Sequence, residues 1–306
     1  MSLVSLLKGR RGDSGFGYAS TAEEVTRGID LRGRTILVTG ANSGLGRESA
    51  RVLASRGARV VAAVRTLEKA RECAAALGNH AVPLACELSE PNSVRAAVTE
   101  LKKQNLQLDV ILCNAGIMAV DERQVRHGHE LQFLTNHLGH FILVTGLLDL
   151  LRAHGRVVML SSDAHHWAPP GGIQFDDPSF ANGYDKWKAY GQSKLANLLF
   201  ARALARRLAG SSRTANAVHP GVIKTNLGRH MSAVQRVGMS IAGAVAFKSI
   251  AEGAATQCFV ATHPSLDAVT GEYFADCNVH RSSRAGRDAE LAERLWTVSE
   301  QIVAAL

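Results

Sequence analysis

Two residues in the stretch AYGQSKLANLLF, residues 189–200, have the types and the spacing to move a proton. Tyr190 and Lys194 are four positions apart, so in a helix their side chains are neighbours on one face. A phenol beside an ammonium ionises more readily than a free phenol, so the pair has the chemistry of a general acid/base. Exposed Tyr–Lys pairs also occur on ordinary amphipathic helices, so the rest of the chain has to decide between the two interpretations.

A glycine-rich turn, TGANSGLG, lies between an apolar stretch and an amphipathic stretch. Its glycines allow a tight turn and a close approach of backbone to a ligand. The helix that follows presents free N–H groups and a positive dipole end to a phosphate. In the context of a strand and a helix, this pattern predicts a nucleotide site. The expected contacts are Gly40, Asn42, Ser43, Gly44, Leu45 and Gly46.

The end of the second apolar stretch indicates which dinucleotide binds. An acidic residue at this place would bind the ribose hydroxyls of NAD, whereas an arginine would pair with the 2′-phosphate of NADP. This chain has Val64 followed by Arg65, and Arg47 adds a positive charge just after the glycine turn. The pattern favours NADP(H) over NAD(H). The alternative for Arg65 is a solvated arginine at a strand end.

Strand and helix patterns alternate from residue 34 onward. Short apolar runs rich in β-branched residues read as buried strands at 34–40, 58–65, 81–88, 108–116, 155–162, 214–221 and 271–275. Helical patterns lie between them at 46–57, 66–78, 91–104 and 130–151, around Tyr190, and at 252–262. This alternation predicts an α/β fold, a doubly wound parallel sheet (Rossmann fold), in a single domain.

The chain divides into a lead-in segment, 1–33, and one domain, 34–306. Ser20 and Glu23 have the spacing of a capping box, which predicts a short helix in the lead-in. The first twelve residues hold a short apolar patch followed by basic residues, which leaves weak contact with a membrane surface open. They do not form a signal peptide, and no apolar run reaches the ~18 residues of a transmembrane helix.

The composition narrows the classes of function. Five cysteines in 306 residues, with no CxxC pair, favour a reducing compartment over a disulfide framework, and we expect a cytoplasmic protein. The formal net charge of +8 raises the question of nucleic acid, but the arginines are dispersed over helix faces, so we expect no nucleic-acid partner. The histidines lack metal-site spacing, so we expect no metal and treat them as loop or surface residues. The oligomeric state stays open, with a homo-oligomer among the alternatives.

Together, the motifs TGANSGLG, CNAG, TNHLGHF, SS, YGQSK and HPGVIKTNL resemble, in this order, the short-chain dehydrogenase/reductase family. ELQFLTNHLGHF and GEYFADCNV resemble its retinol-dehydrogenase-like branch, and STAEEVTRGID resembles the lead-in of the plant chloroplast translocon-associated member of that branch. The resemblance covers nearly the whole chain. It implies an NADP(H)-dependent oxidoreductase that acts on an apolar aldehyde, ketone or alcohol. The alternative is a dinucleotide-sensing binding protein that regulates a partner.

The resemblance also implies roles for individual residues. Tyr190 would be the general acid/base, Lys194 would lower its pKa and bind the nicotinamide ribose, and Ser162 would hold the substrate oxygen. Asn136 would support a water relay behind Lys194. Tyr190, Lys194 and a further set would contact the cofactor: Asn114, Ala115, Gly116, Pro220, Gly221, Val222 and Thr225. Lowering a tyrosine pKa from ~10 to ~7 takes about 4 kcal/mol, which needs a water-poor pocket and the positive charge of oxidised nicotinamide.

Two positions depart from the family pattern. Cys113 replaces the first asparagine of the usual NNAG motif, and we expect little consequence because Asn114 is kept. The resemblance places Glu87 and Leu88 among the cofactor contacts, but Glu87 stands where an aspartate commonly contacts adenine, so this contact is in doubt. The long insert 163–187 after Ser162 reads as a loop near the site. Its aromatic residues either line a substrate pocket or pack in the core: Trp167, Phe175, Tyr184 and Trp187.

Overall fold

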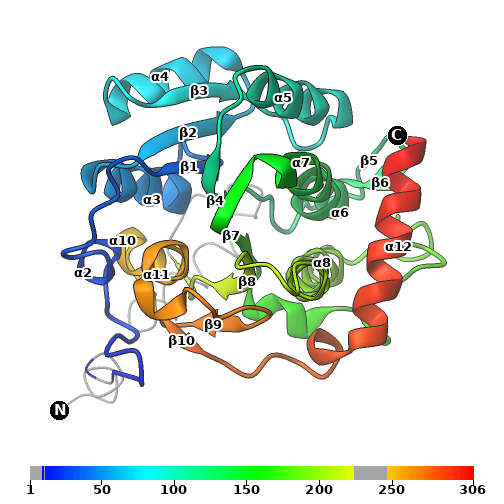
Figure 1. The fold of residues 1–306 in the computed structure, drawn as a ribbon. Coiled ribbons are helices and arrows are strands. Elements are labelled where there is room, and N and C mark those ends of the chain that lie inside the picture. Colours follow the sequence, from blue (N-terminus) through cyan, green and yellow to red (C-terminus); the bar gives the residue numbers. More distant parts are fainter. Residues whose placement is uncertain (1–8, 10, 224–246) are drawn as a thin grey trace.

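The predicted strands assemble into one sheet. The computed structural model describes residue 9 and residues 11–223 and 247–306. Within them, eight strands follow the order β10-β9-β8-β7-β4-β1-β2-β3 (Figure 1). Neighbouring strands are parallel except β9 and β10. Their bounds are β1 Thr35–Thr39, β2 Arg59–Val64, β3 Val82–Ala85, β4 Leu108–Cys113, β7 Leu151–Leu160, β8 Thr214–His219, β9 Tyr273–Ala275 and β10 Asn278–Val279.

The strand order reverses beside β1. The chain runs outward through β2 to β3 and then returns to place β4 on the other side of β1. The central residue pairs show this directly, because Val38 is in register with Ala62 of β2 and with Leu112 of β4. The loops after β1 and β4 therefore diverge at the carboxyl ends of their strands. Open α/β sheets bind their ligands in a crevice at such a point.

Helices cover both faces of the sheet, as predicted for a doubly wound fold. Strand side chains alternate between the two faces, so Leu37 and Ile111 belong to one hydrophobic cluster and Ile36 and Val38 to the other. Figure 1 shows α5, α7 and α8 on one face, and α3, α10 and α11 on the other. The bounds are α3 Gly44–Ser55, α4 Leu67–Leu77, α5 Pro91–Lys103, α7 Gly139–Leu147, α8 Lys186–Arg207, α10 Ile250–Gly253 and α11 Ala255–Thr262.

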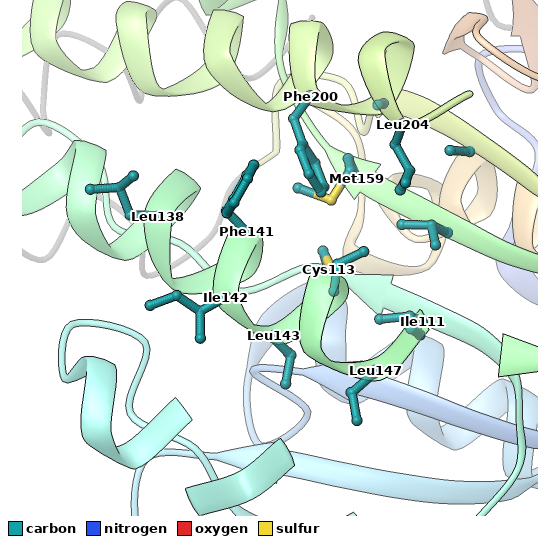
Figure 2. Packing of buried hydrophobic residues seen from close by; sticks show 14 of the residues in the cluster. Ile111, Cys113, Leu138, Phe141, Ile142, Leu143, Leu147, Met159, Phe200 and Leu204 are labelled. Carbon is teal, nitrogen blue, oxygen red and sulfur yellow. The ribbon is translucent and has the colours of Figure 1, made fainter. Parts of the chain in front are cut away.

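The core between α7, α8 and the sheet consists mainly of apolar side chains. Figure 2 shows Phe141 and Phe200 directed at one another from the two helices, above Cys113 and Met159 of the strands. The two rings are 5.3 Å apart between centroids. Cys113 has no exposed surface and packs as a small apolar side chain.

The helix predicted over 130–151 is broken. A short helix α6, Leu131–Phe133, passes into a π-helical turn η1, Leu134–Leu138, before α7 begins, and a 3-10 turn η2, Leu148–Leu150, leads into β7. Gly139 closes the π turn at a place where a Cβ atom would lie 2.3 Å from the carbonyl oxygen of Leu88. Close packing of this segment against the end of β3 thus accompanies the wide turn. Periodicity alone does not distinguish such a turn from a regular helix.

Besides the short strand β10 and the 3-10 turns, two further elements were not predicted. One is a hairpin of β5, Val125–Arg126, and β6, His129–Glu130. The other is the C-terminal helix α12, Ala289–Ala305, which begins at the Asp288 cap and packs across α8 at the right of Figure 1.

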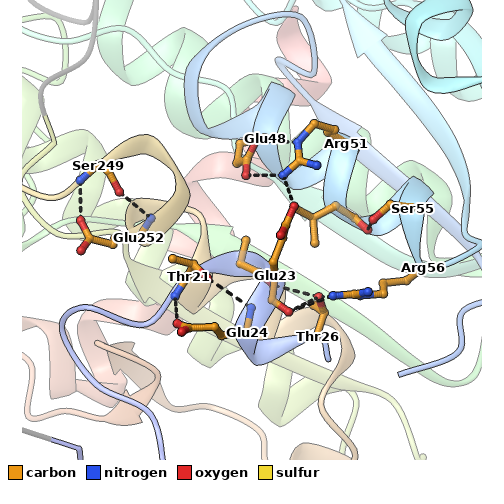
Figure 3. Close-up of polar contacts among 12 residues, drawn as sticks. Thr21, Glu23, Glu24, Thr26, Glu48, Arg51, Ser55, Arg56, Ser249 and Glu252 are labelled. Carbon is orange, nitrogen blue, oxygen red and sulfur yellow. Dashed lines mark hydrogen bonds and ion pairs between the residues drawn. The ribbon is translucent and has the colours of Figure 1, made fainter. Parts of the chain in front are cut away.

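The lead-in contains the expected short helix, with a corrected cap. Helix α2, Ala22–Val25, is capped by Thr21 and Glu24, one residue later than the predicted Ser20 and Glu23. Ser20 instead accepts a hydrogen bond from Gly17 N, and this leaves Glu23 free for Arg51 of α3, 2.7 Å away (Figure 3). The cap therefore shifts because Glu23 serves tertiary docking. No helix within the described ranges has the length and apolarity needed to cross a membrane.

Trp296 of α12 tests how much this helix contributes to stability. Its ring stacks on Phe200 at 5.4 Å and meets Phe141 at 5.0 Å, and it is 7% exposed. We expect Trp296→Ala to lower the free energy of unfolding by about 3 to 5 kcal/mol in urea denaturation. Trp167→Ala, at a ring that is 53% exposed, should cost less than about 1 kcal/mol. Equal losses for the two variants would contradict this packing role.

Candidate active site

Helix α8 brings Tyr190 and Lys194 together as predicted. Asp185 caps the helix by accepting hydrogen bonds from Trp187 N and Lys188 N, which fixes where its first turn begins. The Lys194 Nζ lies 5.6 Å from the centre of the Tyr190 ring. Both side chains are buried, with 8% of Tyr190 and 3% of Lys194 exposed. The interpretation as an exposed surface pair is therefore wrong.

Burial acts on the protonation of both groups. It lowers the pKa of Lys194 to about 8, because an ammonium loses its hydration in the interior. Burial also raises the pKa of Tyr190, and a hydrogen bond with Ser162 opposes this rise only in part. The chain's own residues thus do not produce the predicted lowering of the Tyr190 pKa. They keep the phenol protonated at neutral pH, which is the state that a proton donor needs.

Ser162 reaches Tyr190 from the end of β7. It caps the 3-10 turn η3, Asp163–Trp167, and its side chain hydrogen-bonds that of Tyr190. The preceding residue ties the same strand end to α8, because Ser161 Oγ donates to the carbonyl oxygen of Lys194 at 2.8 Å. Lys194 Nζ donates in turn to the carbonyl oxygen of Leu160 at 3.0 Å. These reciprocal contacts hold the serine and the Tyr–Lys pair at one place.

Asn136 lies in the π turn η1 and faces the same place. Its Oδ1 accepts from Ile117 N at 2.8 Å, and its Nδ2 donates to Ile117 O and to Ser193 Oγ, both at 2.9 Å. A Cβ atom added to Gly116 would lie 3.1 Å from Asn136 Oδ1 and 3.5 Å from Lys194 Nζ. The segment after β4 therefore lies close to both residues, and the missing side chain of Gly116 avoids a tight contact with Asn136 Oδ1. The structure thus brings together all four predicted catalytic residues.

The segment Asn114–Ala115–Gly116, called the strap below, is fixed to the end of β1. Thr39 Oγ1 accepts from the backbone N–H of Asn114 and of Ala115, each at 2.9 Å. The Asn114 side chain donates to the carbonyl oxygen of Thr39 at 2.9 Å. The strap therefore runs directly beside the glycine turn, where a dinucleotide was expected.

The glycine turn fits a pyrophosphate. Gly40 and Gly44 have positive φ angles of 67° and 52°, and a Cβ at Gly44 would meet nothing within 4 Å. Ser43 precedes α3 without capping it through its side chain, so the first N–H groups of the helix are left for an anion. A Cβ at Gly46 would lie 2.3 Å from the carbonyl oxygen of Gly40, so this position accepts only glycine.

The remaining predicted cofactor contacts lie at the glycine turn, after β2 and β3, and after β8. Asn42 and Ser43 are exposed at the turn, whereas the side chain of Leu45 is buried in the core, so only its backbone could face a ligand. Arg65 is exposed at the end of β2 and forms a loose ion pair with Glu87, 3.7 Å between Nε and Oε2. Leu88 is buried, with its carbonyl oxygen against Gly139.

Pro220, Gly221 and Val222 follow β8, and Thr225 lies outside the described residues. Gly221 has a φ of 90°, and a Cβ there would lie 2.7 Å from Cδ of Lys248. Lys248 was not predicted. It is 1% exposed, donates its backbone N–H to Val222 O at 2.9 Å and pairs with Asp276 at 2.5 Å. No sequence pattern singles out this lysine, because its partners come from distant segments.

The insert contributes one aromatic pair to the neighbourhood of Tyr190. Trp167 and Trp187 meet edge to face at 5.6 Å, and Gly191 allows the backbone of Trp167 to approach α8. Tyr184 donates to the carbonyl oxygen of Val120, and Phe175 lies under the guanidinium of Arg294, so both serve packing. Of the four predicted aromatic residues, the tryptophans remain candidates for a substrate wall.

Several histidines are buried rather than exposed, which corrects the expectation for them. His137 and His140 have 1% and 0% exposure. No cluster with metal-binding composition occurs within the described part of the chain. His140 is four residues from Asn136, the same helical spacing as in the Tyr–Lys pair, and this was the available signal that it belongs to the site.

The buried ammonium of Lys194 makes stability depend on pH. Its pKa falls from 10.5 to about 8 on folding, so the unfolded chain binds the proton more tightly and stability rises as pH increases through this interval. We expect Lys194→Met to be more stable than the wild type near neutral pH by roughly 3 kcal/mol, with the gap closing toward pH 10.5. The measurement is urea denaturation across pH.

Lys188→Met is the control, because Lys188 is exposed on the same helix and should give no such gap. A Lys194→Met protein less stable than the wild type near neutral pH would mean that contacts of the ammonium outweigh its loss of hydration.

Sequence profiles of known families match the chain in succession. The short chain dehydrogenase profile matches residues 34–175, and the Enoyl-(Acyl carrier protein) reductase profile matches residues 178–275. The chain is 42% identical to Short-chain dehydrogenase TIC 32 A, chloroplastic, from Brassica napus, over 100% of both proteins. It is 38% identical to Retinol dehydrogenase 14 from Homo sapiens, over 93% of this chain and 91% of that protein.

Solved structures of similar proteins agree with these sequence matches. A crystal structure of an uncharacterized protein from Mycobacterium Paratuberculosis matches with a TM-score of 0.75 and 35% identity, covering 94% of this chain and 98% of that one. The Pseudomonas aeruginosa RhlG/NADP active-site complex matches with a TM-score of 0.63 and 27% identity, covering 80% and 95%. The chain therefore belongs to the short-chain dehydrogenase/reductase family, whose members are oxidoreductases that bind a nicotinamide dinucleotide.

Proposed function

We propose that this protein is an NADP(H)-dependent oxidoreductase that transfers a hydride between the nicotinamide and an apolar aldehyde, ketone or alcohol. The observation that carries the proposal is the meeting of Tyr190, Ser162 and Lys194 beside the strap. When bound, NADPH supplies the hydride. A retinol dehydrogenase and an NADP complex among the similar proteins support the apolar substrate and the choice of cofactor.

The chain's own residues have separate tasks in this reaction. Ser162 and Tyr190 hydrogen-bond the carbonyl oxygen, which draws electron density from the carbon that accepts the hydride. Tyr190 then donates its proton to the developing alkoxide, and its raised pKa ensures that the proton is present. Lys194 places a positive charge beside the resulting phenolate. Asn136, held 2.8 Å from Ile117 N, supports the passage of the next proton to Lys194.

Arg65 is the proposed contact for the 2′-phosphate. Its side chain is 60% exposed at the end of β2, where it forms a loose ion pair with Glu87. A phosphate would be a stronger partner than this carboxylate, because two parallel hydrogen bonds to one guanidinium become available.

Three further properties are separate proposals: a cytoplasmic location, a homo-oligomeric state and weak contact with a membrane surface. Cell fractionation, light scattering and vesicle flotation test them in that order.

Tyr190→Phe tests the chemical step. The variant removes the proton donor and keeps the ring, so we expect kcat to fall by at least about 100-fold with NADPH binding unchanged. The measurement is absorbance of the nicotinamide band with a panel of aldehydes and ketones, together with a fluorescence titration of NADPH. If the wild type binds NADPH but reduces no member of the panel, the enzyme proposal fails and a dinucleotide-sensing role replaces it.

Arg65→Ala tests the choice of cofactor. Loss of a charged hydrogen bond to phosphate should raise the KM for NADPH about tenfold or more and leave the KM for NADH nearly unchanged. Glu87→Gln is the matched control, because it releases Arg65 and removes a negative charge beside it, so the KM for NADPH should fall. Equal effects of Arg65→Ala on both cofactors would overturn the assignment.

A further inference from the structure

A buried chain of hydrogen bonds joins the strap to the π turn through His140. His140 Nε2 lies 2.9 Å from Thr39 Oγ1, and its Nδ1 lies 2.8 Å from the carbonyl oxygen of Asn136. Thr39 is the last residue of β1 and immediately precedes Gly40 of the glycine turn. The imidazole therefore spans the distance between the expected cofactor site and a predicted catalytic residue.

The neighbouring groups define the proton positions on this ring. Thr39 Oγ1 accepts two backbone N–H groups of the strap, so its own hydrogen points to His140 Nε2, which must accept it. The carbonyl oxygen of Asn136 can only accept, so Nδ1 must carry the hydrogen. Both contacts require the same neutral tautomer. Burial lowers the pKa of His140 to about 4, which agrees with a neutral ring at physiological pH.

The two contacts constrain different parts of the site. On one side, the Thr39 hydroxyl holds Asn114 and Ala115, and Gly116 follows them toward Asn136 and Lys194. On the other side, His140 Nδ1 donates to the carbonyl oxygen of Asn136. This bond holds a residue of the π turn, where the backbone is wider than in an α-helix. A single ring thus sets the spacing between the strap and the turn.

His137 lies in the same segment and shows that burial alone does not produce this arrangement. It is also fully enclosed, but its Nε2 meets Ser299 of α12 at 2.9 Å. Its ring contacts Phe133 at 5.1 Å. His137 thus supports the attachment of the C-terminal helix, and its Nε2 pairs with Ser299 rather than with Thr39.

We propose that His140 is a positioning residue that couples the cofactor strap to the turn carrying Asn136. The inference rests on the proposed function, because it assigns Asn136 and the strap their roles in hydride transfer. His140 contacts neither substrate nor cofactor in this account. It acts through the residues at its two ends, so each end should affect a different kinetic parameter.

Two substitutions separate the two ends. His140→Gln places an acceptor near the position of Nε2 and loses the donor to Asn136, so kcat should fall about tenfold with the KM for NADPH within about twofold of the wild type. His140→Asn keeps a donor near the position of Nδ1 and leaves the Thr39 hydroxyl without its acceptor. It should raise the KM for NADPH about fivefold or more and change kcat less than about threefold.

His137→Asn and His137→Gln are the matched controls, measured at a temperature where every variant is folded. They should lower the melting temperature and leave kcat and KM at wild-type values. If the two His140 variants behave like these controls, or if both change kcat and KM in the same proportion, His140 has only a structural role and the proposal is overturned.

A direct titration of NADPH keeps the test independent of turnover. If the wild type reduces no carbonyl compound, the proposed function fails, but the Kd for NADPH still decides the coupling. A Kd raised in His140→Asn and unchanged in His140→Gln supports the role of the Thr39 end. Equal Kd values in the two variants contradict it.

Discussion

The whole site depends on keeping one ammonium group, that of Lys194, out of water. A charge in the interior needs compensation, and here the backbone carbonyl of Leu160 accepts a hydrogen bond from the ammonium at 3.0 Å. Helix α8 and the end of β7 hold each other through this bond and through Ser161. Gly116 lies beside the ammonium, and a side chain there would crowd Asn136 Oδ1, 3.1 Å from its Cβ. The contacts that position the catalytic residues are therefore the same contacts that join α8 to the end of β7.

The same burial explains why Tyr190 and Lys194 do not simply acidify one another. In water-poor surroundings, each group prefers its neutral form, so the tyrosine keeps its proton and the lysine holds its own less firmly. Ionisation of the phenol therefore needs a further positive charge. Oxidised nicotinamide carries that charge, so in the proposed reaction the Tyr190 phenol gives up its proton only as the nicotinamide becomes oxidised.

Much of this could be predicted from local patterns. The glycine turn, the alternation of strands and helices, and the Tyr190–Lys194 spacing depend on residues close in sequence, and the structure follows them. The positions of Ser162 and Asn136 came from the family resemblance. The π turn, the ring of His140 against Thr39 and the ion pair of Lys248 depend on contacts between distant segments. Periodicity and composition hold no information about such contacts, and the capping pair moved by one residue for the same reason.

In the proposed reaction, a hydride passes from the nicotinamide to a carbonyl carbon beside Tyr190. Mass spectrometry of the alcohol formed from NADPH labelled with deuterium at the transferable position of the ring tests this most directly. We expect a single deuterium on the carbinol carbon of the wild-type product, with label transfer at least about 100-fold slower in Tyr190→Phe. An alcohol formed without the label, or label transfer that persists undiminished in Tyr190→Phe, would contradict it.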